Sequence, residues 1–406
     1  MFRASLRLCL VGILLVTTSG CWDRQEVDKL AIVTGLGIDL ISGPEPYLIT
    51  AQVVSTGSQK TMQESGQPKP FVTTFAQGKT ISEAIHNFSK ESPRKMFFAH
   101  NNIVVMGEKL AEKGIQDFMD FLDRSPQFRR NAWLFVTPKT AKEVLQTQCD
   151  IQKYAAIGLK EMIYERYHPA SNKMQRKDTM SRIYGRSSAA IALKIDIMNT
   201  NDLEQQKLKK AGNVIQDPKK QASEGKDQLR ISGFSVFNTE KFVGYLNDEE
   251  TQGMLWFINE HKDFPIRLSC PSTEQKYIVF LLNQTALNMD PVMNEEPLQM
   301  NIAVKDNAIV SENNCPELSV FNPEDKKDLE QKLNEAVKEQ MFLSLKKVQH
   351  MGTDVLHFAD NFYQQDPVKW KTIVQSYNEQ FAKTQVTIQV RSEIRLTGMT
   401  SEGAMH

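Results

Sequence analysis

The first twenty-one residues most constrain where this chain can fold, because they combine an export signal with a terminal cysteine. Arg3 and Arg7 precede an apolar run at 8–16, and small residues follow that run up to Gly20. A positive start, a short apolar region and small residues before a cleavage point are the layout of a secretory signal. The run is too short for a membrane-spanning helix, which needs roughly twenty apolar residues. We therefore predict that residues 1–20 are a signal peptide and that the body folds outside the cytosol.

Cys21 is the predicted lipid anchor. Residues 18–21 read TSGC and resemble a bacterial lipobox, in which small residues precede a cysteine that receives diacylglycerol on its thiol. The resemblance implies cleavage before Cys21, followed by S-diacylglycerol and N-acyl modification with chains such as palmitate. One acyl chain gives only marginal binding, at about 0.8 kcal/mol per buried methylene, whereas two or three chains hold a protein firmly. An ordinary cysteine behind a cleaved signal is the alternative interpretation.

The rest of the chain has the composition of a globular protein. Its 406 residues suffice for about two or three domains, and 40% hydrophobic with 24% charged residues argue against extensive disorder. Without the signal, 47 Lys and Arg face 49 Asp and Glu, which disfavours nucleic-acid binding driven by net charge. The five cysteines lack paired spacing, which disfavours a disulfide framework or a zinc site. Cys270 and Cys315 could form one bridge or remain free thiols.

A strand and helix rhythm predicts an N-terminal α/β domain over 21–197. Thr80 and Glu83 predict a capping box at the start of a helix, and a single helix is expected over 108–122. The glycines of GLGIDL at 35–40 are interpreted as permitting close packing, because Leu40 replaces the third glycine of a dinucleotide fingerprint. Further strands and helices are predicted at 30–40, 47–54, 71–75, 102–106 and 132–136, and at 139–147 and 151–166.

A linker or long polar loop is predicted at 198–228, and a C-terminal α+β domain at 229–406. The linker residues are polar and offer little to a core. Asn322 and Pro323 then begin a helix of about 25 residues that ends near Gly352. Strands are expected at 229–237, 242–246, 277–282, 300–304 and 386–396, with a helix at 248–259. The expected fold class is α+β, multi-domain, with mixed β-sheets, packed helices and one long helix in the C-terminal half.

No catalytic pattern stands out. The chain lacks a phosphate loop, a G-x-S-x-G elbow and an H-E-x-x-H helix. His100, before a strand, is interpreted as a hydrogen-bonded structural histidine. Asp123 and Arg124 are expected to pair with Arg129 or Arg130 at the surface, where ion pairs contribute little. We therefore predict no catalytic residue, no metal site and no cofactor, and Cys21 stays the single predicted site.

Several motifs together closely resemble the Ger(x)C family, the lipoprotein C subunits of nutrient germinant receptors in spore-forming bacteria. The first is GCWD at 20–23, followed by LAIVTGLGID at 30–39. His100-Asn101-Asn102, GFSVF at 233–237, Asp354-Val355 and DPVKW at 366–370 extend the resemblance. The likeness covers essentially the whole chain after the signal.

The resemblance implies a peripheral lipoprotein on the outer face of the spore inner membrane, a cell membrane. Its implied partners are the membrane-spanning A and B subunits and membrane lipid, with no nucleic acid. The family has an α+β fold and no established catalysis, so the expected function is that of a non-enzymatic receptor subunit required for spore germination. One alternative is a solute-binding lipoprotein that captures the nutrient itself, which predicts two similar lobes around a cleft. Another, an exported cell-wall hydrolase, has no motif in its favour.

Overall fold

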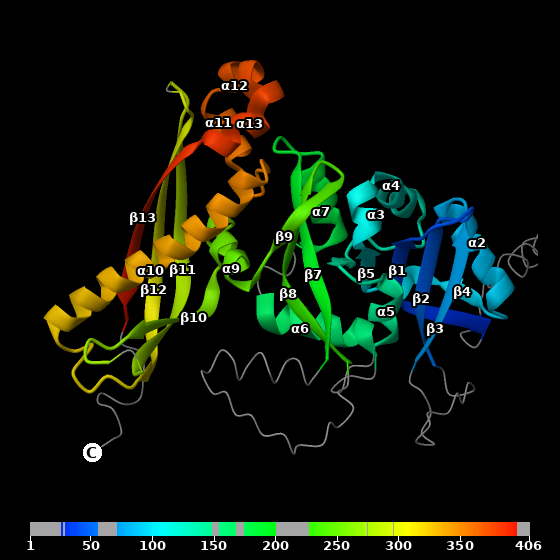
Figure 1. The fold of residues 1–406 in the computed structure, drawn as a ribbon, viewed down its shortest axis with the longest axis horizontal. Coiled ribbons are helices and arrows are strands. Elements are labelled where there is room, and N and C mark those ends of the chain that lie inside the picture. Colours follow the sequence, from blue (N-terminus) through cyan, green and yellow to red (C-terminus); the bar gives the residue numbers. More distant parts are fainter. Residues whose placement is uncertain are drawn as a thin grey trace, which may run out of the picture.

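The fold is α+β, with two mixed sheets and packed helices (Figure 1). The computed structural model describes residues 26, 29–55, 71–147, 154–167, 174–199, 227–273, 275–294 and 296–395. The predicted signal peptide, Cys21 and most of the predicted linker lie outside these residues. The first sheet lies at one end of the elongated molecule and the second sheet at the other.

The first sheet has nine strands in the order β3-β2-β1-β5-β6-β7-β8-β9, and β4 pairs with β1. The central strands β1, β5, β6 and β7 run parallel, and the outer strands join antiparallel on both sides. The strands are β1 (Leu30–Leu40), β2 (Tyr47–Val54), β3 (Phe71–Gly78), β4 (Lys95–Phe97), β5 (Ile103–Gly107), β6 (Trp133–Thr137), β7 (Ala189–Asn199), β8 (Asp227–Asn238) and β9 (Lys241–Leu246). The strands predicted up to residue 136 are confirmed, and β3 continues beyond its predicted end.

The first sheet continues across the predicted linker, because β7 and β8 pair with each other. Their ladder contains ten residue pairs, from Ala189 opposite Asn238 to Asn199 opposite Asp227. Both ends of the predicted linker, 198–199 and 227–228, are therefore strand residues, since they continue this hydrogen-bonded ladder. Residues 200–226 lie outside the described part of the chain.

Helices cover both faces of this sheet: α2 (Ile81–Glu91), α3 (Glu108–Lys113), α4 (Gln116–Arg124), α5 (Ala141–Gln146), α6 (Ala155–Tyr167) and α7 (Arg176–Ile183), with the 3₁₀ turn η2 (Phe98–His100). The single helix predicted over 108–122 is wrong. Gly114 takes a φ of +127°, which interrupts the helix and separates α3 from α4. The next amide, that of Ile115, donates to the carbonyl of Glu240 beside β9.

The capping box predicted for α2 is half present. The Thr80 hydroxyl accepts from the amide of Glu83, as predicted. The Glu83 carboxylate instead accepts from the amide of Lys79, one residue before the cap. Both contacts still satisfy amides at the start of the helix.

The second sheet has the order β10-β11-β12-β13, from β10 (Lys262–Ser269), β11 (Tyr277–Val292), β12 (Gln299–Asn313) and β13 (Gln385–Ile394). The long helix α10 (Pro323–His350) lies diagonally across it (Figure 1). Asn322 caps this helix, and its buried stripe is the predicted set: Leu329, Leu333, Val337, Met341, Leu345 and Val348. The long-helix prediction is confirmed. The strands β11 and β12 are much longer than predicted, since their outer halves alternate apolar with exposed polar residues.

Of the remaining helices, one joins the two sheets and the others lie beside the second sheet. Helix α9 (Asp248–Phe257) packs on α10, where Gly253 lies against the backbone of Gln340, and its buried Met254, Leu255 and Trp256 belong to a core that reaches both sheets. At the top of Figure 1 lie α11 (Phe358–Gln365), α12 (Pro367–Ile373) and α13 (Tyr377–Lys383), with the 3₁₀ turn η4 (Val374–Ser376). Cys270 and Cys315, whose state the sequence left open, form a disulfide.

Candidate functional site

The anchor prediction at Cys21 stays a prediction, since that residue lies outside the described part of the chain. Within the described ranges, no helix is both long enough and apolar enough to span a bilayer. The same ranges contain no group of three or more His, Cys, Asp or Glu side chains able to hold a metal ion.

The GLGID motif positions helix α5 against the first sheet. A Cβ on Gly35 would lie 2.9 Å from Leu145 Cδ2, and one on Gly37 would lie 3.0 Å from Ala141 Cβ. The two glycines therefore permit the close packing that the sequence predicts. Asp39 on the same strand accepts hydrogen bonds from the amides of Ala141 (2.7 Å) and Lys142 (3.1 Å), so it caps the start of α5. Burial raises the pKa of Asp39, and these amide bonds oppose the rise.

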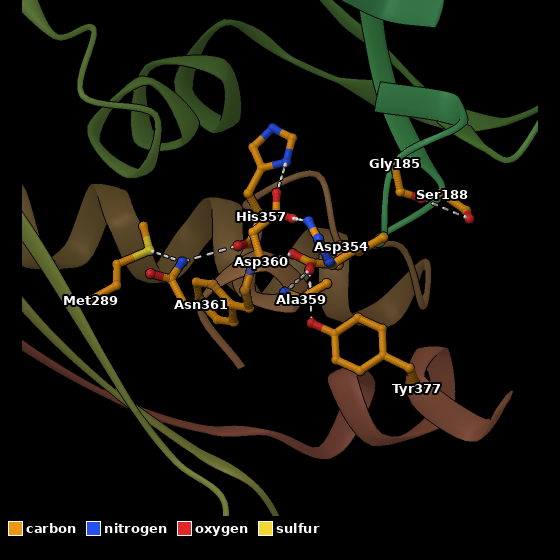
Figure 2. Close-up of polar contacts among 11 residues, drawn as sticks. Gly185, Ser188, Met289, Asp354, His357, Ala359, Asp360, Asn361 and Tyr377 are labelled. Atoms are coloured by element: carbon orange, nitrogen blue, oxygen red, sulfur yellow. Dashed lines mark hydrogen bonds and ion pairs between the residues drawn. The ribbon is translucent and has the colours of Figure 1, made fainter. Parts of the chain in front are cut away.

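Asp354, in the second half, caps a helix in the same way (Figure 2). Its carboxylate accepts from the amides of Phe358 (3.1 Å) and Ala359 (2.8 Å), at the start of α11, and from the Tyr377 hydroxyl (2.7 Å). Burial raises the pKa of Asp354 to about 6, and the three hydrogen bonds oppose that rise. Asp354 therefore fastens α11 to α13 through buried contacts.

The DPVKW motif caps α12. Its Asp366 carboxylate accepts from the amides of Val368 (3.0 Å) and Lys369 (2.9 Å), and Pro367 occupies the first turn. Trp370 packs on Tyr377, with ring centroids 4.8 Å apart. In each of these three motifs, the aspartate carboxylate accepts hydrogen bonds from two backbone amides.

Beside the Asp354 network, an ion pair joins the half of the molecule that contains the first sheet to the half that contains the second. Arg186, in the turn between α7 and β7, reaches Asp360 on α11 at 3.1 Å and lies over the Tyr363 ring at 3.8 Å from its centroid. The labelled Gly185 and Ser188 mark this turn in Figure 2, and His357 lies 3.8 Å from Asp360. This contact and α9 connect the first sheet to the helices around the second.

A polar pocket of about 430 Å³ lies at the amino ends of the parallel strands β1, β5 and β6. We call it the HNN pocket, because His100, Asn101 and Asn102 line it just before β5. Helix α6 contributes Lys160 and Tyr164. The remaining lining residues are Ile32, Thr34, Ala99, Arg129, Asn131, Trp133 and Gln175. No acidic side chain is among them.

Two groups of residues interpreted from the sequence lie at or near the HNN pocket. His100 is exposed and lies in η2 beside Phe97, with ring centroids 5.6 Å apart, and the hydrogen-bonded structural role interpreted for it stays a prediction. The expected pair of Asp123 with Arg130 is confirmed at 3.4 Å. Arg129 instead lines the pocket.

Two further ion pairs near the end of α4 were not predicted. Asp123 also pairs with the buried Arg176 at the start of α7, and Arg124 pairs with Asp120 at 2.7 Å. The Asp123 contact crosses between helices that are distant in the sequence, so no local spacing indicated it.

Two family models match the chain on either side of the β7–β8 connection. The "Spore germination protein N-terminal domain" matches residues 23–197, and "Spore germination B3/GerAC like, C-terminal" matches residues 232–398. The chain belongs to the Ger(x)C family of spore germination proteins. Among curated relatives, spore germination protein KC of Bacillus subtilis (strain 168) is 26% identical and aligns over 99% of this chain and 98% of its own. Spore germination protein B3 of the same organism is 23% identical, over 94% and 95%.

The fold also matches a solved structure. The crystal structure of the GerBC protein superposes with a TM-score of 0.52 and 17% identity, covering 89% of this chain and 96% of that one. At this identity the likeness concerns the fold alone. The α+β architecture expected from the sequence is therefore confirmed both by the elements observed and by a related structure.

Proposed function

We propose that this chain is a lipid-anchored, non-enzymatic subunit of a nutrient germinant receptor, required for spore germination. It would lie on the outer face of the spore inner membrane and act through contacts with membrane-spanning subunits. The observation that carries the proposal is the match of both halves to spore germination domains, joined to a leader that ends in Cys21. That leader supplies the means by which the protein would stay at a membrane, since no helix within the described residues is long and apolar enough to cross one.

The environments of the motif carboxylates support a non-enzymatic role. Asp39, Asp354 and Asp366 each accept two backbone amide hydrogen bonds at the start of a helix. A general acid or base needs a proton-transfer atom within reach of a substrate. These carboxylates are instead committed to holding α5, α11 and α12 in place.

Anchoring would also allow small or weak interfaces with the membrane-spanning subunits to suffice for assembly. A tether confines the body to a layer beside the membrane, which raises its effective concentration toward membrane-embedded partners. The acyl chains would supply retention, so the protein contacts need to supply only orientation and specificity.

The architecture disfavours the solute-capture alternative in its two-lobed form. The two sheets differ in strand number and order, with nine strands at one end and four at the other. Within the described residues the chain therefore does not form two similar lobes around a cleft.

Substitution of the anchor residue tests the proposal. We expect Cys21→Ala to move the protein from the membrane fraction to the soluble fraction of spores, and to slow nutrient-triggered germination. Cys149→Ala, which removes a thiol far from the leader in the sequence, is the matched control and should leave both properties unchanged. Full membrane retention and normal germination in the Cys21→Ala strain would overturn the proposal.

A further inference from the structure

The HNN pocket has the composition of a recognition site for a small anion. Arg129, in the loop after α4, and Lys160, on α6, bring two cations to it, and His100 lies at the same place. No acidic residue lines the pocket, and within the described residues neither Arg129 nor Lys160 takes part in an ion pair. Cations at a pocket that lacks acidic side chains favour a ligand with negative charge, and guanidinium groups match carboxylates well.

The buried side-chain amide of Asn101 adds a second requirement for the ligand, which is a hydrogen-bond donor. Asn101 is only 4% exposed, and among the described residues its Oδ1 has no hydrogen-bond partner. A buried carbonyl oxygen without a partner is costly, and most such oxygens are paired in folded proteins. Asn101 therefore calls for a hydrogen-bond donor on the ligand, and the side-chain amides of Asn102 and Asn131 line the same pocket.

The nature of that donor follows from the charge of the lining. An ammonium group would enter a pocket with two cations and no carboxylate to balance it, whereas a hydroxyl group donates without adding positive charge. Trp133 and Tyr164, packed edge to face with centroids 5.5 Å apart, give the pocket an apolar wall for a short carbon chain. The volume of about 430 Å³ suits a small molecule.

We propose that the HNN pocket binds a small hydroxylated carboxylate. The carboxylate would pair with Arg129 and Lys160, and the hydroxyl would donate to the Asn101 side chain. This binding site goes beyond the proposed function and does not depend on the anchor, so the two proposals can fail separately.

Calorimetric titration of the purified, detergent-solubilised full chain tests the proposal, with L-malate as the probe. We expect saturable binding with a Kd below about 1 mM. Succinate lacks the hydroxyl, L-alanine carries an ammonium group, and inorganic phosphate lacks the carbon chain. Each should bind about tenfold more weakly than L-malate. Absence of L-malate binding at millimolar concentration, or equal binding of succinate, phosphate or L-alanine, would overturn the proposal.

Variants then locate the site. Arg129→Gln and Lys160→Gln should each weaken L-malate binding about tenfold or more, which corresponds to about 1.4 kcal/mol or more. Arg130→Gln is the matched control, because Arg130 is adjacent in sequence but pairs with Asp123 and does not line the pocket. Unchanged thermal melting would show that the variants fold. Folded variants that bind L-malate as tightly as the parent would refute the assignment to this pocket.

Discussion

Replacing Asp306 with Asn should remove a loss of folding stability that arises in the second sheet as the pH rises. Asp306 lies on the buried face of β12, between Val304 and Ala308, and is 2% exposed. The Ser392 hydroxyl on β13 donates to one carboxylate oxygen at 2.9 Å, while the other oxygen has no partner in the described part of the chain. Burial raises the pKa of Asp306 to about 7, and the Ser392 hydrogen bond only partly opposes the rise.

The sign of the effect follows from the direction of this shift. The pKa of Asp306 is higher in the folded protein than in the unfolded chain, where it is near 3.8. The folded state therefore holds the proton more tightly, and its stability falls as the pH rises from about 4 to about 7. At about 1.4 kcal/mol per pKa unit, ionisation of this carboxyl costs on the order of 4 kcal/mol of unfolding free energy by pH 8. Asn resembles the protonated acid and avoids that cost.

Urea unfolding at pH 4 and pH 8, followed by circular dichroism, measures this difference. We expect the stability of Asp306→Asn relative to the parent to be higher at pH 8 than at pH 4 by roughly 3–4 kcal/mol. Any change in hydrogen bonding caused by the amide is independent of pH, so the comparison between the two pH values isolates the ionisation. Asp290→Asn, at an exposed position on β11, is the matched control. An equal effect of Asp306→Asn at both pH values would refute the reasoning.

Two further substitutions test the packing of α9 on α10 and the buried hydrogen bond between Tyr377 and Asp354. Gly253→Ala would place a Cβ 2.0 Å from the Gln340 carbonyl oxygen, so α9 and α10 must separate. We expect a loss of about 2–4 kcal/mol, seen as a lower melting temperature, and unchanged melting would contradict the close approach. Tyr377→Phe removes the hydroxyl that donates to Asp354 and should cost about 1–2 kcal/mol in urea unfolding. Tyr184→Phe, at a residue 68% exposed, is its control, and equal effects of the two would count against the buried bond.

Local signals in the sequence predict the elements whose stability is encoded locally. Asn322 and Pro323 identify the start of α10 because a cap and a proline act on the adjacent amides alone. Gly114 shows the limit of such signals. A helix tolerates an isolated glycine, and the break depends on a carbonyl from Glu240, far along the chain, which accepts from Ile115.

The HNN pocket could be predicted only in part. The His100-Asn101-Asn102 segment was visible as a motif, but Arg129 and Lys160 reach the pocket from a loop and a helix with no fixed spacing to it. Asp123 likewise joins Arg130 and the distant Arg176, which leaves Arg129 for the pocket. Assigning such neighbours requires knowledge of which strand ends lie together in space.

The β7–β8 ladder has a consequence for how this protein can be divided. The two matched family regions fall on opposite sides of residues 200–226, yet strands from both sides lie in one sheet. Either half expressed alone would present an open strand edge prone to self-association. A single proteolytic nick within 200–226 should instead leave two fragments that co-purify, so this connection offers a position for inserting a reporter without dismantling the sheet.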